Sequence, residues 1–131
     1  LLKKSKNPTI FIDFMHTKKF IPTEEREECF FQALLKKYKD VKQFDIIITT
    51  DDNALNFIRK YRKKSAKFKD AKIFFEGVNN LKLFNILNKN IYAGVFEKKN
   101  PLSNLNIALK LKPNLKTIYL ISDTSNSGNK T

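Results

Sequence analysis

The amino-acid sequence predicts an α/β fold, a parallel sheet covered by helices on both faces. Short β-type runs alternate with helical segments five times along the 131 residues, which is the pattern of repeated βαβ units. The run Phe44–Thr49 is nearly continuous in apolar character, as in a strand buried on both faces. Hydrophobic residues make up 41% of the chain, enough for one core of ordinary domain size. An intrinsically disordered chain is therefore excluded.

The first half of the chain predicts two strands and two helices. Residues 9–15 are β-branched and aromatic and predict a strand. A helix follows over Thr23–Lys39, with Thr23 as N-cap, acidic residues in its first turn and lysines in its last. Phe44–Thr49 predicts the second strand. Asp51, Asp52 and Asn53 come directly after it, so we expect the next helix to begin there with an Asp as cap and to run to Tyr61.

The second half repeats this alternation. Lys72–Glu76 predicts a third strand that breaks at Gly77, and a shorter helix follows over residues 81–87. Ile91–Phe96 predicts the fourth strand. Asn100 and Pro101 then form a cap and first turn of a helix that runs to Leu111. Residues 117–121 predict a fifth strand, followed by a polar tail.

The net charge of +13 favours a solvated, lysine-rich surface. The 26 basic residues comprise 23 Lys, scattered along the whole chain, and only 3 Arg. A surface that binds phosphates usually combines Arg with Lys, and this chain has few Arg. A face for nucleic acid or anionic membrane is therefore the less favoured alternative. The sequence shows no secretory signal, and no apolar run reaches the length of a membrane span. The single Cys29 excludes an internal disulfide and a Cys-based zinc site.

Polar clusters follow four of the predicted strands. The carboxyl ends of parallel strands meet at one edge of a sheet, where such folds place their ligands. Asp, Asn, Thr and Ser side chains there are suited to a small polar ligand. Taken singly, each cluster also fits a helix cap or a turn. The candidate ligand-binding residues are His16, Thr17, Lys18, Thr50, Asp51, Asp52, Asn53, Asn79, Asn80 and Asp123.

No catalytic site, metal site or cofactor is predicted. Three glycines cannot supply a dinucleotide-binding loop, and the sequence contains no nucleophile elbow. His16 is the only histidine, which excludes a cluster of imidazole ligands, and it fits a loop residue better than a base. A response-regulator receiver would share the fold class, but the lysine that it requires after the fifth strand is missing.

Five segments carry a resemblance to a known family. They read FIDFMHTKKF (11–20), FDIIITTDDNALNFIRKYR (44–62), FFEGVNN (74–80), NIYAGVFEK (90–98) and LNIALKLKPNLKTIYLISDTSNSG (105–128). In this order they resemble the ABC-type substrate-binding-protein-like sensor domains, which are the extracytoplasmic ligand-binding regions of bacterial sensor histidine kinases and diguanylate cyclases. The same fold family includes substrate-binding lipoproteins of ABC transporters. Where the family often has Asp after the Met of the first segment, this chain has His16.

The resemblance implies a periplasmic-binding-protein-like fold of two flavodoxin-like lobes, incomplete here at both ends. Residues 1–100 would form most of the first lobe without its opening strand, and residues 101–131 the crossover helix and first strand of the second. The missing strand would normally lie in the middle of the first sheet. Its place would have to be filled by rearranged pairing, by a partner chain or by further residues.

The function implied by the family is binding rather than catalysis. A small polar solute would bind between the lobes, and closure would signal to a membrane-attached output domain that holds any kinase or cyclase activity. The expected location is periplasmic, anchored to the inner membrane in the parent protein, and a homodimer is possible. The alternatives are the substrate-binding protein of an ABC transporter and a basic nucleic-acid-binding module.

Overall fold

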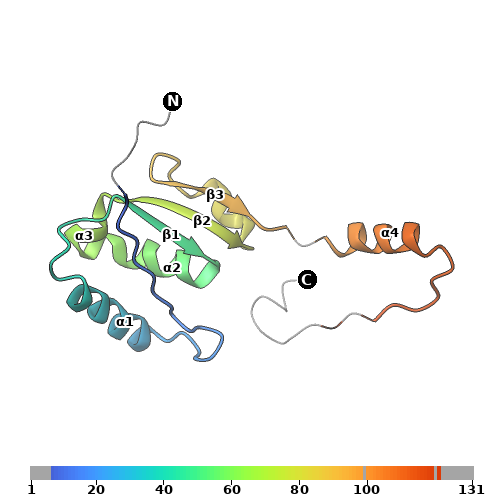
Figure 1. Cartoon of the computed structure of the whole chain (residues 1–131), viewed down its shortest axis with the longest axis horizontal. Helices are drawn as coiled ribbons and strands as arrows, with labels where there is room; N and C mark the ends of the chain where they lie inside the picture. The colour runs from blue at the N-terminus through green and yellow to red at the C-terminus, as the bar shows by residue number, and fades with distance from the viewer. Residues whose placement is uncertain (1–6, 99, 120, 122–131) are drawn as a thin grey trace.

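The computed structural model describes residues 7–98, 100–119 and 121, and three parallel strands form its centre (Figure 1). In chain order the elements are α1 (Glu24–Lys37), β1 (Ile46–Thr50), α2 (Asp52–Tyr61), the 3₁₀ turn η1 (Arg62–Lys64), α3 (Ala66–Lys69), β2 (Lys72–Val78), the 3₁₀ turn η2 (Leu81–Asn85), β3 (Tyr92–Phe96) and α4 (Pro101–Leu111). The α/β class is thus confirmed.

The sheet has the order β1-β2-β3, and both neighbouring pairs run parallel. Ile47 lies opposite Ile73 in the first pair, and Phe75 lies opposite Gly94 in the second. The register of β2 and β3 shifts between Phe75 and Val78, where Gly77 adopts a φ of 63°. Such a bulge interrupts regular pairing, and the positive φ favours glycine. Pairing resumes at Val78 and Phe96, so β2 continues past Gly77, where the sequence predicted a break.

Two of the five predicted strands are wrong for the residues that the structure describes. Residues 9–15 are extended but pair with no strand, and residues 117–119 and 121 adopt no regular structure. Leu120 lies outside the described residues. A β-type run becomes a strand only where another backbone lies within hydrogen-bonding distance, and local sequence does not supply that neighbour. The helix expected over 81–87 is instead the 3₁₀ turn η2, with i to i+3 bonds such as Leu83 N–H to Asn80 O at 3.1 Å.

The hydrophobic core lies on one side of the sheet, between the strands and helices α1, α2 and α3. Leu55 and Tyr61 of α2 pack there with Phe31 of α1 and with Ile73 of β2. Alternate residues of β2 point to this side and are buried up to Phe75, as the two-residue period of a strand requires.

The opposite side of the sheet is apolar and exposed, and we call it the open face. Ile48 of β1 is 69% exposed and Val95 of β3 is 70% exposed; Ile46 and Phe74 complete this face. The prediction of helices on both faces is therefore wrong for the described part of the chain. All the helices that pack on the sheet lie on its other side.

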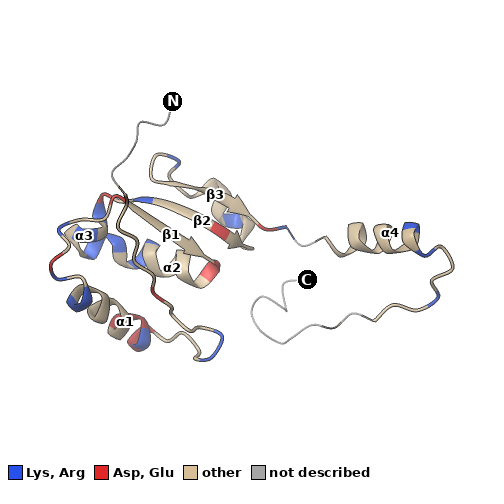
Figure 2. Cartoon of the chain, in the orientation of Figure 1, with Lys and Arg blue, Asp and Glu red and all other residues tan. Residues whose placement is uncertain are grey.

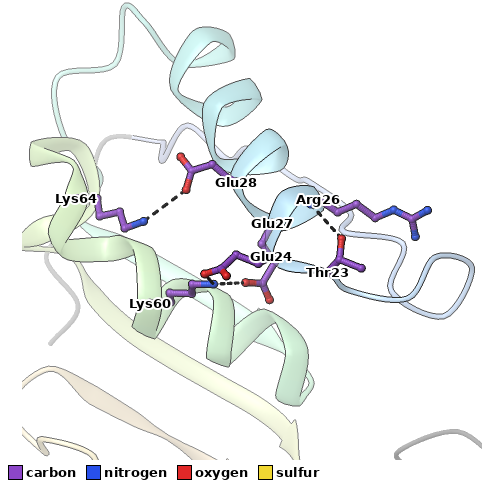
Figure 3. A network of polar contacts seen from close by, with 7 residues as sticks. All are labelled: Thr23, Glu24, Arg26, Glu27, Glu28, Lys60 and Lys64. Atoms are coloured by element: carbon purple, nitrogen blue, oxygen red, sulfur yellow. Dashed lines mark hydrogen bonds and ion pairs between the residues drawn. The ribbon is translucent and has the colours of Figure 1, made fainter.

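Helix α1 is joined to α2 by a network of charges (Figure 3). Thr23 caps α1 by accepting the amide of Arg26 at 3.3 Å, as predicted from the sequence. Lys60 of α2 lies between Glu24 and Glu27 of α1, at 3.0 Å from each carboxylate, and Lys64 lies 3.4 Å from Glu28. Lys60 of α2 and Lys64 of η1 thus neutralise acidic residues in the first half of α1.

Helix α4 stands away from the sheet (Figure 1). It begins as predicted, with Asn100 Oδ1 accepting the amide of Ser103 at 3.1 Å and Pro101 in its first turn. None of its residues is buried. We call residues 100–119 and 121 the C-terminal arm. The division into lobes at residue 100 stays a prediction.

Candidate functional site

The best-supported candidate site is the carboxyl edge, where β1 and β2 end. Asp51 follows β1 with a φ of 96°, an unfavourable conformation for a residue with a side chain. Its amide donates to Glu76 O of β2 at 3.0 Å. Its carboxylate accepts the amides of Asn53 at 2.8 Å and Ala54 at 3.1 Å, so Asp51 is the N-cap of α2.

Asp52 links the end of β1 to the turn after β2. One of its carboxylate oxygens accepts the amide of Asn79 at 3.2 Å, and the other accepts the amide of Asn80 at 3.1 Å. The carboxylate also lies in the first turn of α2, where the helix dipole favours a negative charge. Two predicted polar clusters are therefore held side by side by one side chain.

The two asparagines of this turn differ in what they bond. The Asn80 side chain accepts the amide of Lys82 at 3.2 Å and so caps η2. The Asn79 amide nitrogen donates weakly to Gly77 O at 3.4 Å, while its carbonyl oxygen is buried without a hydrogen-bond partner among the described residues. A buried acceptor of this kind costs free energy unless a donor reaches it. Asn79 thus contributes a buried hydrogen-bond acceptor that has no partner among the described residues of this edge.

The structure brings most, but not all, of the predicted residues together. The side chains of Asp51, Asp52, Asn53, Asn79 and Asn80 are half-buried around this edge, and Thr50 is exposed beside them. Much of the hydrogen bonding is internal, because the cap and turn interpretations also hold for Asp51 and Asn80. Carboxylate and amide groups remain clustered within a few residues of two strand ends. Asp123 lies outside the described residues.

His16, Thr17 and Lys18 form a separate group near the start of α1. His16 has a φ of 52°, and its carbonyl accepts the amides of Lys19 and Phe20 at 2.9 and 3.0 Å, which closes a turn. Thr17 lines a cavity of about 40 Å³ with Arg26 and Glu27 of α1, whereas His16 and Lys18 are exposed. The structure gives Thr17 no contact with Asp51, so the predicted cluster divides in two.

A larger cavity, of about 190 Å³, lies between residues 7–15 and β1, and we call it the β1 groove. One wall is formed by Phe11, Asp13 and Met15, the other by residues 46–49. The floor is apolar and comes from the helices, with Phe30 and Leu34 of α1 and Phe57 and Ile58 of α2. This site was not predicted from the sequence. The two-residue period of Phe11, Asp13 and Met15 was the available signal, because alternate residues of an extended segment share one side.

The groove contains two polar features. Asp13 accepts a hydrogen bond from the Tyr38 hydroxyl and lies 2.7 Å from the ammonium of Lys37. Burial raises the pKa of Tyr38, and its hydrogen bond to Asp13 raises it further. Thr49 is 5% exposed, and its hydroxyl has no hydrogen-bond partner among the described residues. The groove is otherwise lined by apolar and aromatic side chains.

Within the described residues no group of three or more His, Cys, Asp or Glu side chains is placed to hold a metal ion. No helix in the described part of the chain combines the length and apolarity needed to cross a membrane. Compared with known proteins, the chain matches no family model, no curated protein and no solved structure.

Proposed function

We propose that this chain is an extracytoplasmic sensor domain that binds a small polar solute at the carboxyl edge, as part of a bacterial transmembrane signalling protein. The observation that supports this most is the link from Asp52 to the amides of Asn79 and Asn80. It gathers carboxylate and amide groups from two strand ends at the edge where parallel sheets bind ligands. The sensor role itself depends on the family resemblance of the five sequence segments.

The chemistry of this edge favours a solute that donates hydrogen bonds. The N-terminus of α2 would by itself attract an anion, but Asp51 and Asp52 already place carboxylates there. The buried carbonyl oxygen of Asn79 needs a donor. An amine or a polyhydroxylated compound supplies donors, and an amine also gains from the two negative charges.

The alternative function, the substrate-binding protein of an ABC transporter, uses the same site. The two functions differ in what the domain is attached to rather than in how it binds. A transmembrane segment followed by a kinase or cyclase domain in the gene product supports the sensor. A lipoprotein signal with no output domain supports the transporter.

A nucleic-acid-binding module is the weaker alternative because the arginines are engaged within the fold. Arg62 is buried and donates to Lys69 O, Arg59 donates to Asn56 at 3.1 Å, and Arg26 donates to Ile21 O at 3.0 Å. In Figure 2 the basic residues are spread over several helices, strands and loops and do not gather on a single element. A salt titration of binding to labelled DNA and RNA tests this alternative, because phosphate-driven affinity falls steeply with salt.

The test of the proposed site is a thermal-shift screen with amines, amino acids, sugars and polyols, followed by calorimetric titration of each solute that stabilises the chain. We expect a stabilising solute to lose its effect in the Asp51→Ala, Asp52→Ala double variant and in Asn79→Ala, which leaves the cap of α2 intact. Lys18→Ala is the matched control from the separate turn and should bind normally. Equal stabilisation of the wild type and Asn79→Ala would show that the solute does not bind at the carboxyl edge.

A further inference from the structure

The outer edge of β1 has backbone groups that are not paired in the described structure. Asp45 O accepts the amide of Lys72 at 3.0 Å and the amide of Asp51 donates to Glu76 O, so the odd-numbered residues of this strand face β2. The backbone groups of Ile46 and Ile48 therefore point the other way, toward the β1 groove. An edge of this kind is ready to pair with another strand.

The groove beside this edge has the form that an added strand needs. Residues 7–15 are extended along its far wall, and a cavity of about 190 Å³ lies between them and β1. Apolar side chains from every second residue of an added strand would fill the cavity, against Phe30, Leu34 and Phe57. The remaining side chains would extend the open face beside Ile46 and Ile48.

The C-terminal arm carries an unpaired apolar segment of the matching type. Residues 117–121 are β-branched, aromatic and aliphatic in sequence, and their number equals the length of β1. Ile118, Tyr119 and Ile121 are 54%, 86% and 93% exposed. Exposed apolar β-type segments are rarely left uncovered in solution, because pairing and burial both lower the free energy.

Helix α4 of the arm needs a surface as well. It has 11 residues, and an isolated helix of about this length is only marginally stable in water. Leu102, Leu105 and Leu109 form an apolar stripe at i, i+3 and i+7. The helix is about 16 Å long, which matches the length of a five-residue strand, so it can lie along the open face over Ile48, Phe74 and Val95.

We infer that two copies of this chain associate by exchanging their C-terminal arms. In each copy the partner's residues 117–119 and 121 lie along the free edge of β1, and the partner's α4 covers the open face. The arm stands away from its own sheet (Figure 1), so the donor and acceptor surfaces are exposed together and are complementary between copies. An arm of this length supplies about as many residues as one side of a standard interface, roughly 20 to 30.

Sedimentation and light scattering over a dilution series test the exchange. The exposed Cys29 requires a reducing buffer, so that a disulfide cannot create the dimer. We expect a dimer for the wild type and at least about tenfold weaker association for Ile118→Asp in the arm and for Ile48→Lys on the open face. The matched controls are Asn114→Asp in the arm and Ile86→Lys, an exposed residue away from the open face; both should dimerise like the wild type.

Mixing the two disruptive variants distinguishes arm exchange from other modes. Ile48→Lys retains an intact arm, and Ile118→Asp retains an intact acceptor surface. A mixture of the two should therefore form a heterodimer that is more stable than the homodimer of either variant. A wild type that remains monomeric at every concentration would overturn the inference, since the arm would then be free or folded onto its own sheet. Undiminished dimerisation of Ile48→Lys would also overturn it, because the arms would then associate with each other.

Discussion

The carboxylate of Asp52 accepts the backbone amide of Asn80 at 3.1 Å, across 28 positions of sequence. With the second bond, to the amide of Asn79, this contact ties the first turn of α2 to the turn that follows β2. The carboxyl edge is therefore a single hydrogen-bonded unit rather than two independent loops. A solute that bound Asn79 would meet a turn already fixed by Asp52.

We predict that Asp52→Ala lowers the free energy of unfolding by about 1 to 3 kcal/mol, because two half-buried amides lose a charged acceptor. Urea unfolding followed by circular dichroism measures this loss. Asp40→Ala, which removes an exposed carboxylate after α1, is the control and should change stability by less than about 0.5 kcal/mol. Equal effects of the two variants would show that the link from Asp52 to Asn79 and Asn80 does not stabilise the edge.

The two described glycines of the sheet region should tolerate alanine very differently. At Gly94 an added Cβ would lie 2.6 Å from Cγ of Phe75 and closer still to its carbonyl oxygen, so the neighbouring strand must move. At Gly77 an added Cβ meets only the Asp51 amide nitrogen at 3.7 Å, and the cost is the positive φ of 63°, about 1 to 2 kcal/mol.

We therefore predict that Gly94→Ala is much more destabilising than Gly77→Ala, by at least about 2 kcal/mol in urea unfolding. Both variants add one methyl group, so each is the control for the other. A smaller loss for Gly94→Ala than for Gly77→Ala would mean that β3 does not lie against Phe75 as described.

Features set by neighbouring residues could be predicted from the sequence. Thr23, Asp51 and Asn100 cap α1, α2 and α4 because a cap depends on residues two or three positions away. The parallel pairing of β1 with β2 also followed from sequence, since a helix between two strands requires a crossover connection. The neighbouring positions of Asp51, Asp52, Asn79 and Asn80 then followed from that topology.

Features that depend on a distant surface could not be predicted. Residues 9–15 and 117–121 have the composition of strands, but β-propensity measures how a side chain fits a pleated, half-buried surface. Whether such a segment pairs depends on where another backbone edge lies. The same reason applies to the 16–18 turn, which follows residues 9–15 toward Arg26 and Glu27 of α1 rather than toward Asp51.

The charge network that joins α1 to α2 and η1 predicts how stability depends on pH. The hydrogen bond from Gln32 holds the pKa of Glu28 below its usual value, and the charge of Lys64 lowers it further. A carboxylate with a lowered folded pKa stabilises the fold above its unfolded pKa of about 4.5, and this contribution disappears as the pH falls through the folded value.

We therefore predict that Glu28→Gln is less stable than the wild type at pH 7 and that the difference disappears as the pH falls through the lowered pKa of Glu28. The pair is exposed, so the difference should also shrink in 1 M salt, where charges are screened within roughly 3 Å. Urea unfolding across this pH range measures it. Glu25→Gln is the control, because it also removes one negative charge from the first half of α1. A difference that persists at acid pH would assign the effect to packing instead.

The contact between Tyr38 and Asp13 holds residues 7–15 against α1, and it predicts the behaviour of the β1 groove. The Tyr38 hydroxyl donates to the Asp13 carboxylate, and the Tyr38 ring packs edge-on against Phe11 with centroids 4.9 Å apart. Tyr38→Phe keeps the ring and removes only the hydroxyl. We predict a loss of about 1.5 to 3 kcal/mol in urea unfolding, the range for a hydrogen bond to a charged group.

The same substitution should loosen one wall of the groove. Hydrogen exchange of residues 9–15 should accelerate in Tyr38→Phe, while exchange in β2 should change only as much as global stability does. Tyr92→Phe in β3 is the control, because it also keeps the ring and Tyr92 lies away from residues 9–15. Unchanged exchange at residues 9–15 would show that the aromatic contacts of Phe11 with Tyr38 and Phe44 suffice to hold this wall.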